Sequence, residues 1–133
     1  MPINRASDVS LYTFSMPGRD QATPQLTVRP YASPSRGSKE ISAWRVTYAS
    51  HLESRSGFTD REYVAVVLSG AMHVVLDGEP HTLQAGDTLI VPAHVTVTVS
   101  NPHSEPAEML EMTPVGTQVT FPGQDPCIPP WAE

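Results

Sequence analysis

The sequence predicts an all-β protein, whose antiparallel strands close into a barrel or into two packed sheets. Residues 62–101 alternate β-branched and polar side chains over short stretches, which is typical of strands half-buried in a sheet. Glycine turns separate these stretches, at Ser69-Gly70, Asp77-Gly78 and Ala85-Gly86. Fourteen prolines and eight glycines in 133 residues argue against long helices. A chain of this length can bury the core of one domain without a metal ion or a disulfide.

Residues 1–39 are the least regular part of the chain. LYTFSM and QLTVRPYA read as short strands, and Pro30 marks the second as an edge strand or a bend. PGRDQATP and SPSRGSKE have the composition of loops. We expect an arm that belongs to the same domain and either wraps the barrel or pairs with a second subunit.

Residues 40–115 are expected to form the barrel core. EISAWRVTYASHLES reads as one strand that turns Trp44, Val46 and Tyr48 to one face and Arg45, Thr47, Ala49 and His51 to the other. A turn at Ser56-Gly57 is expected before a strand over 58–69. Further strands are predicted over 71–77, 80–84, 87–91, 94–100 and 107–115. The total of about eight to ten strands suffices to close a barrel or two sheets.

Residues 116–133 form a proline-rich tail that ends near Trp131. We expect it to lie as a strap across the outside of the barrel, because a tryptophan gains much from covering apolar surface. A lid over a site and a dimer contact are the alternatives. Cys127 is the only cysteine, so it cannot form an internal disulfide, and no neighbouring base in the sequence makes it a nucleophile.

Charge is divided unevenly along the chain. Residues 1–61 contain all eight Lys and Arg with five acids, whereas 62–133 contain nine acids and no Lys or Arg. The halves are expected to attract each other within the fold; alternatively, a basic rim receives an anionic ligand, with Arg29, Arg36, Arg45, Arg55 and Arg61. A net charge of −6 with one lysine does not fit nucleic-acid binding. The sequence contains no long apolar run and no secretory signal, so no membrane association and a cytoplasmic location are expected.

Two motifs can be followed along the strands. One runs from Gly86 through Pro92 to Asn101, and the other ends at Gly70, with Tyr63 seven residues earlier. This pattern resembles that of the cupin superfamily, of the RmlC-like kind, and residues 58–114 look most like small single-domain members of the EutQ type. The resemblance implies a jelly roll, also described as a double-stranded β-helix.

The chain departs from the cupin pattern where the metal ligands belong. Val97 occupies the place of the histidine in one motif, His94 that of a glycine, and Tyr63 that of the glutamate in the other. The pair of histidines one residue apart is missing, since His51 lies twelve residues before Tyr63 rather than six or seven. We therefore expect no metal cofactor. A rearranged metal site remains an alternative, built from some of His51, His73 and His94 with Glu62.

Tyr63 and His51 are the catalytic candidates. The resemblance implies that Tyr63 points into the barrel, where its phenol could donate a hydrogen bond or a proton. His51 shares a strand face with Arg45 and could act as a general base near neutral pH. The substrate-binding candidates are Trp44, Arg45, Tyr48, His73, His94 and Val97. His81 and His103 are expected in solvent-facing loops.

Three functions follow from these expectations. The first is a metal-independent isomerase, dehydratase (lyase) or cyclase that acts by acid–base chemistry on a small carbonyl or polyketide-like substrate. The second is a non-catalytic cupin that binds or senses a small molecule, and the third is an assembly module. A homodimer is expected under all three, because cupin barrels commonly pair through an outer sheet. Fold alone does not choose among the activities of this superfamily.

Overall fold

The computed structural model describes residues 2–8, 10–14 and 24–133, and these contain eleven strands and three short 3-10 helices. The strands are β1 (Tyr12–Phe14), β2 (Leu26–Ala32), β3 (Ile41–Tyr48), β4 (Leu52–Thr59), β5 (Tyr63–Ser69), β6 (Ala71–Leu76), β7 (Glu79–Gln84), β8 (Thr88–Val91), β9 (Val97–Asn101), β10 (Ala107–Pro114) and β11 (Val119–Thr120). The helices are η1 (Ala6–Asp8), η2 (Pro34–Arg36) and η3 (Pro130–Ala132).

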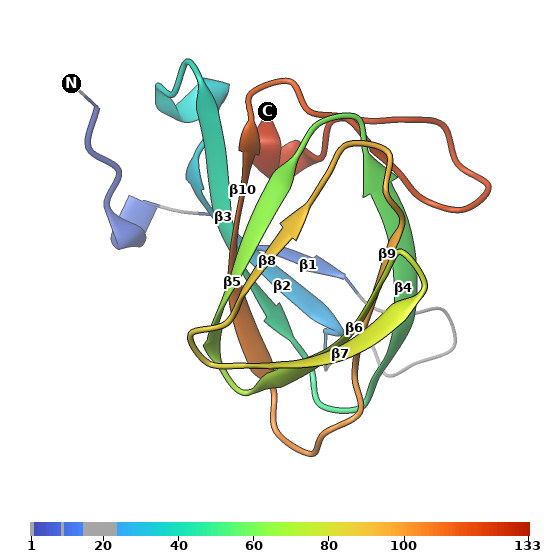
Figure 1. The fold of residues 1–133 in the computed structure, drawn as a ribbon. Coiled ribbons are helices and arrows are strands. Elements are labelled where there is room, and N and C mark those ends of the chain that lie inside the picture. The colour runs from blue at the N-terminus through green and yellow to red at the C-terminus, as the bar shows by residue number, and fades with distance from the viewer. Residues whose placement is uncertain (1, 9, 15–23) are drawn as a thin grey trace.

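The strands form two antiparallel sheets that face each other as a jelly roll (Figure 1). One sheet has the order β1-β2-β3-β10-β5-β8, and the other has the order β11-β4-β9-β6-β7. Every strand pair is antiparallel, and β10 from late in the chain lies between β3 and β5. The predicted all-β class and the jelly-roll fold are confirmed.

The core lies between the two sheets, because alternate residues of each strand point inward. Val46 and Tyr48 of β3 face Met72 and Val74 of β6 across the interior, and all four are buried. Polar residues lie on the opposite faces of many strands, such as Arg45 on β3. The alternation predicted from sequence therefore sets which side chains can reach the interior.

The expectation of one continuous strand from Glu40 to Ser54 is wrong. β3 ends at Tyr48, and the chain reverses through a turn in which His51 has a positive φ of 56°. The Ser56-Gly57 turn is also wrong, because both residues lie within β4 and pair with β9. The φ of Gly57 lies outside the left-handed region that turns require of glycine, so the serine–glycine pair continues the strand instead of ending it.

The two ends of the chain contribute to the sheets. β2 pairs along β3 and therefore belongs to the six-stranded sheet, with Pro30 at an irregularity in that pairing. β1 pairs with β2, although Ser15 and Met16 of the LYTFSM segment and most of PGRDQATP lie outside the described residues. β11 pairs with β4, and Trp131 follows it on η3.

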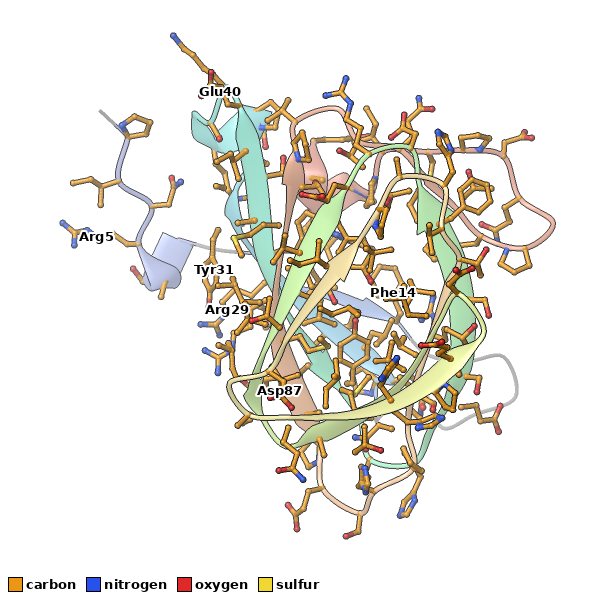
Figure 2. All side chains as sticks on the ribbon, viewed as in Figure 1. Arg5, Phe14, Arg29, Tyr31, Glu40 and Asp87 are labelled. Atoms are coloured by element: carbon orange, nitrogen blue, oxygen red, sulfur yellow. The ribbon has the colours of Figure 1, made fainter. Side chains whose placement is uncertain are left out.

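Within the six-stranded sheet, a basic residue from the first half of the sequence pairs with an acidic residue from the second half. Arg45 on β3 forms an ion pair and a hydrogen bond with Glu108 on the neighbouring β10. Arg29 lies beside them on β2, and Figure 2 shows it at the outside of the roll. No helix in the described part of the chain is long and apolar enough to span a membrane.

Candidate functional site

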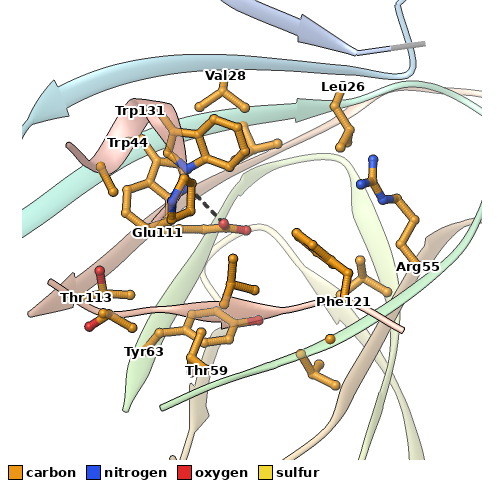
Figure 3. A pocket seen from close by; sticks show the side chains of 18 of the residues that line it. Leu26, Val28, Trp44, Arg55, Thr59, Tyr63, Glu111, Thr113, Phe121 and Trp131 are labelled. Carbon is orange, nitrogen blue, oxygen red and sulfur yellow. Dashed lines mark hydrogen bonds between the residues drawn. The ribbon is translucent and has the colours of Figure 1, made fainter. Parts of the chain in front are cut away.

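A cavity of about 160 Å³ lies between the two sheets, beneath the C-terminal helix η3 (Figure 3). Its wall is mostly apolar, with valines from β2, β3, β9 and β11. The aromatic residues in the wall are Trp44, Tyr48, Phe58, Tyr63, Phe121 and Trp131. Among the described residues that line it, Glu111 is the one carboxylic acid and Arg55 the one basic residue. An apolar wall with a few convergent polar groups is the usual composition of a small-molecule site.

Glu111 on β10 presents its carboxylate to this cavity. The indole Nε1 of Trp44 donates to Oε1 at 3.0 Å, and the phenol of Tyr48 donates to Oε2 at 2.7 Å. An indole N–H can only donate, so Oε1 must act as an acceptor, whereas a tyrosine hydroxyl can donate or accept. A proton on Oε1 would break the hydrogen bond from Trp44, whereas a proton on Oε2 is compatible with Tyr48 acting as the acceptor. Oε2 is therefore the oxygen on which Glu111 can gain and lose a proton while both contacts are kept.

The environment of Glu111 shifts the acidity of the whole group. Burial raises the pKa of the Glu111 carboxyl, and the hydrogen bonds from Tyr48 and Trp44 offset part of that rise. Burial and the neighbouring Glu111 charge raise the pKa of the Tyr48 phenol well above its usual range. A carboxyl group held in this way is a stronger base than one in water, which suits proton abstraction near neutral pH.

Tyr63 opens β5 and lines the same cavity, as predicted from sequence. Burial and the charge of Glu111 raise the pKa of its phenol, so Tyr63 keeps its proton across the physiological range. Nearby, Thr59 also lines the cavity, but its hydroxyl donates to the carbonyl of Arg61. Tyr63 is therefore suited to donate a hydrogen bond into the cavity.

Trp131 covers the cavity from η3. Its ring packs edge-on against Trp44, Tyr12 and Phe14, with centroids 6.4, 6.2 and 5.3 Å away. Its indole Nε1 is buried, and no acceptor for it occurs in the described part of the structure. Residues 122–127 of the tail are exposed, whereas Trp131 turns inward and makes its apolar contacts at the open edge of the roll.

Four of the sequence-predicted site residues meet in this cavity. Tyr63, Trp44, Tyr48 and Val97 all line it, and they come from β5, β3 and β9. They do so because strand alternation turns each of them to the inner face. What any of them does chemically stays a prediction.

The other predicted site residues lie elsewhere. His51 is exposed in the β3–β4 turn, His73 points to the outer face of β6 between the buried Met72 and Val74, and Arg45 lies on the outer face of β3. His94 is exposed with a positive φ of 67°, beside Phe58 at the outer end of the roll. The structure thus does not bring His51 to Tyr63, because β3 turns Trp44, Val46 and Tyr48 inward and Arg45 outward, and His51 lies beyond the end of that strand in an exposed turn.

The metal-ligand positions of the cupin pattern do line the cavity, yet they do not fit a metal ion. Tyr63 and Val97 replace the glutamate and one histidine, and Gly57, six residues before Tyr63, occupies the place of the first paired histidine. Thr59 follows where the second would be. The described residues contain no group of three or more His, Cys, Asp or Glu placed to hold a metal, so His51, His73, His94 and Glu62 do not form the rearranged site.

Sequence reasoning missed Glu111 and the inward turn of Trp131. A signal for Glu111 was present, because Ala107, Met109, Glu111 and Thr113 alternate along β10 and place one carboxylate on an otherwise uncharged inner face. Nothing in the tail's composition distinguishes an inward tryptophan from one that covers the outer surface.

Residues 49–113 match the family model of the cupin domain. Together with the jelly-roll topology, this match identifies a cupin domain over residues 49–113. The likeness to the EutQ type stays a prediction. A comparison with curated proteins gives no match.

Several solved structures share the fold at low sequence identity. The polyketide cyclase RemF from Streptomyces resistomycificus superimposes with a TM-score of 0.74 and 18% identity, over 94% of this chain and 87% of that one. An RmlC-like cupin from Shewanella frigidimarina gives 0.62 and 18%, over 84% and 88%. Salicylate 1,2-dioxygenase from Pseudoaminobacter salicylatoxidans gives 0.65 and 18%, over 80% of this chain but 31% of the longer enzyme. At these identities the likeness establishes the fold alone.

Proposed function

We propose that this protein binds a small cyclic carbonyl compound in the cavity and moves a proton on it, as an isomerase, dehydratase or cyclase. The single observation that carries the proposal is the Glu111 carboxylate, which is buried in an apolar aromatic cavity and oriented by Trp44 and Tyr48. A buried base fixed by two donors beside a protonated phenol is the usual composition of an acid–base site.

The proposed step uses groups already in place. Glu111 Oε2 takes a proton from a carbon next to the substrate carbonyl, and the C–H electrons move into the carbonyl to give an enolate. Tyr63 and the Trp131 N–H are the donors available to the enolate oxygen. Return of the proton from Glu111 to another carbon of a conjugated enolate completes an isomerisation. In the alternative, the enolate carbon attacks a second carbonyl carbon, the electrons of that C=O bond move to its oxygen, and Glu111 returns the proton to this oxygen, which gives a ring that carries a hydroxyl group. Donors aimed at developing negative charge are the main contribution such a site can make.

The fold supports this class without deciding it. One structural neighbour is a polyketide cyclase, and the similarity covers most of both chains at 18% identity. Other neighbours are dioxygenases, but the positions that would hold a metal carry Gly57, Thr59, Tyr63 and Val97 here. The cavity chemistry therefore favours proton transfer over oxygenation.

The test is hydrogen–deuterium exchange into single-ring ketones and cyclic β-keto esters in D₂O, followed by NMR. Wild-type protein should accelerate exchange at the carbon next to the carbonyl, and Glu111→Gln and Tyr63→Phe should each lower the rate by about 100-fold or more while the fold is retained. Glu108→Gln, on the outer face of the same strand, and Tyr31→Phe, outside the cavity, are the matched controls. Wild-type exchange rates in Glu111→Gln would refute the assignment.

A non-catalytic binding cupin is the second candidate. The observation that favours it is that both oxygens of Glu111 already accept a hydrogen bond from the protein. Glu111 would then organise the aromatic wall, and the Trp131 N–H would hold the ligand. Thermal stabilisation by ring compounds without exchange or any new product in mass spectrometry would select this function over catalysis.

A further inference from the structure

Arg55 is a cation that β4 turns toward the cavity. Leu52 of β4 is buried in the core, and regular alternation from it would turn Ser54 and Ser56 inward. The pairing with β9 is instead irregular between Leu52 and Arg55, after which Arg55 pairs with Val99 and Gly57 with Val97. Val97 and Val99 line the cavity, so this bulge moves Arg55 onto the cavity-lining face.

The guanidinium of Arg55 lies over the ring of Phe121, whose centroid is 5.9 Å from Cζ. Stacking on a ring uses the face of a guanidinium and leaves its five N–H groups, which lie in its plane, able to donate. Among the described residues, the ion pairs are those of Arg45 with Glu108 and of His81 with Glu79, and neither involves Arg55. Arg55 is half-buried, so an anion placed against it would be shielded from much of the solvent.

Arg55 and Glu111 come from opposite sheets, β4 and β10, and Figure 3 shows them apart at the cavity wall. The positive charge of Arg55 acts across the cavity on Tyr48, where it offsets a small part of the rise in the pKa of the phenol. The cavity therefore has a basic end at Arg55 and an acidic end at Glu111, with aromatic and valine side chains between them.

We propose that the ligand is a single-ring anion, whose carboxylate is bound by Arg55 while its ring lies in the apolar cavity toward Glu111. This inference rests on the proposed use of the cavity as a ligand site. The volume of about 160 Å³ suits one ring, since an apolar cavity of about 150 Å³ is known to take up benzene. A planar guanidinium can hold a carboxylate through two parallel hydrogen bonds, which fixes the orientation of the ring.

The test compares benzoate with benzamide, two probes of the same shape that differ in charge, by isothermal titration or ligand-observed NMR. Wild-type protein should bind benzoate at least about 10-fold more tightly, the effect of one charge-assisted contact. Arg55→Gln should bring the two affinities within about 2-fold, and Arg55→Lys should keep part of the preference because the charge remains. Arg61→Gln, at an exposed arginine that does not line the cavity, should leave the preference unchanged.

The outcomes separate this inference from the proposed chemistry. Glu111→Gln should bind benzoate as well as wild type or better, because a negative charge is removed from the cavity. A preference for benzoate that Arg55→Gln abolishes supports the inference even if no variant alters proton exchange. Equal affinity for the two probes in wild type, a preference that survives in a folded Arg55→Gln protein, or no binding of either probe would overturn it.

Discussion

Glu111 illustrates how a single side chain can define a site. The inner face of β10 otherwise carries Ala107, Met109 and Thr113, all buried. Placing a carboxylate in that row costs free energy unless its oxygens are hydrogen-bonded, and Trp44 and Tyr48 supply those bonds. A core that needed only packing would be served as well by an apolar residue, so the cost of Glu111 is consistent with a chemical role.

The raised pKa of Glu111 predicts a pH-dependent cost in stability. Burial disfavours the charged form of Glu111 in the folded state, so its pKa is higher in the folded than in the unfolded protein. The contribution of Glu111 to the free energy of unfolding is therefore greatest below the unfolded-state pKa of about 4.3, and it is lost as the pH rises through the raised pKa of the folded state. Glu111→Gln should therefore melt a few degrees higher than wild type at pH 8, with the difference shrinking toward pH 4. Circular dichroism melting curves over this range check it, with the exposed Glu62→Gln as control. A variant that is less stable at pH 8 would contradict the prediction.

Replacing Trp131 should affect ligand binding more than the stability of the free protein. Its buried N–H has no partner in the described structure, and leaving a donor unbonded costs about 1–3 kcal/mol. Trp131→Phe removes that donor but keeps a ring against Trp44, so the free protein should keep most of its stability. Affinity for a ligand that offers an acceptor oxygen should fall by about 2- to 10-fold. Parallel melting and titration measurements separate the two effects, and unchanged affinity for such a ligand would exclude the contact.

Strand β4 determines which polar side chains reach the cavity from the five-stranded sheet. Its sequence, LESRSGFT, lacks a clear alternation of apolar and polar residues, and so the sequence alone did not predict either its start or its bulge. The structure shows the reason for Gly57, since a Cβ atom there would lie 3.2 Å from the carbonyl of Thr120 and 3.3 Å from the ring of Phe121. A glycine between Arg55 and Thr59 thus lets β11 and Phe121 close against β4.

Two turn glycines offer a matched test of how tightly the strands are connected. Gly70 and Gly78 both have a positive φ, of 75° and 81°. A Cβ on Gly70 would lie 2.5 Å from the carbonyl of Pro106, whereas nothing lies within 4 Å of one on Gly78. Gly78→Ala should therefore cost only the backbone strain of about 1–2 kcal/mol. Gly70→Ala should cost clearly more, because the backbone at Pro106 must also shift. Urea denaturation of both variants measures the difference in the free energy of unfolding. Equal costs would show that the close contact between residue 70 and the Pro106 carbonyl does not destabilise the variant.

For the whole molecule, the sequence predicted the class of fold better than the details of the site. Glycine turns and regular alternation over residues 62–101 specify β5 to β9 well, and the spacing of Gly70, Gly86, Pro92 and Asn101 identified the superfamily. Tyr63 and Val97 were placed at the cavity by that spacing. The errors fall on residues 40–60, and the inward turn of Trp131 was not predicted, because tertiary contacts decide the conformation in both places. A turn formed by Ala49, Ser50 and His51 carries no glycine or proline to mark it.

The expected homodimer remains a prediction, and the outer face of the six-stranded sheet is where we expect it. Val64, Val66, Leu110 and Met112 lie in register on the face opposite the core, and Leu68 and Ile90 beside them are 41% and 56% exposed. A second copy covering this face would remove a contiguous apolar surface from water, which single exposed residues would not require. Size-exclusion chromatography with light scattering should then give twice the mass of one chain. Ile90→Asp should shift the protein to monomer, whereas Ile3→Asp, which is 73% exposed and lies outside strands β5, β8 and β10, should not. A monomeric wild type at micromolar concentration would contradict the prediction, and a dimer that survives Ile90→Asp would place the contact elsewhere.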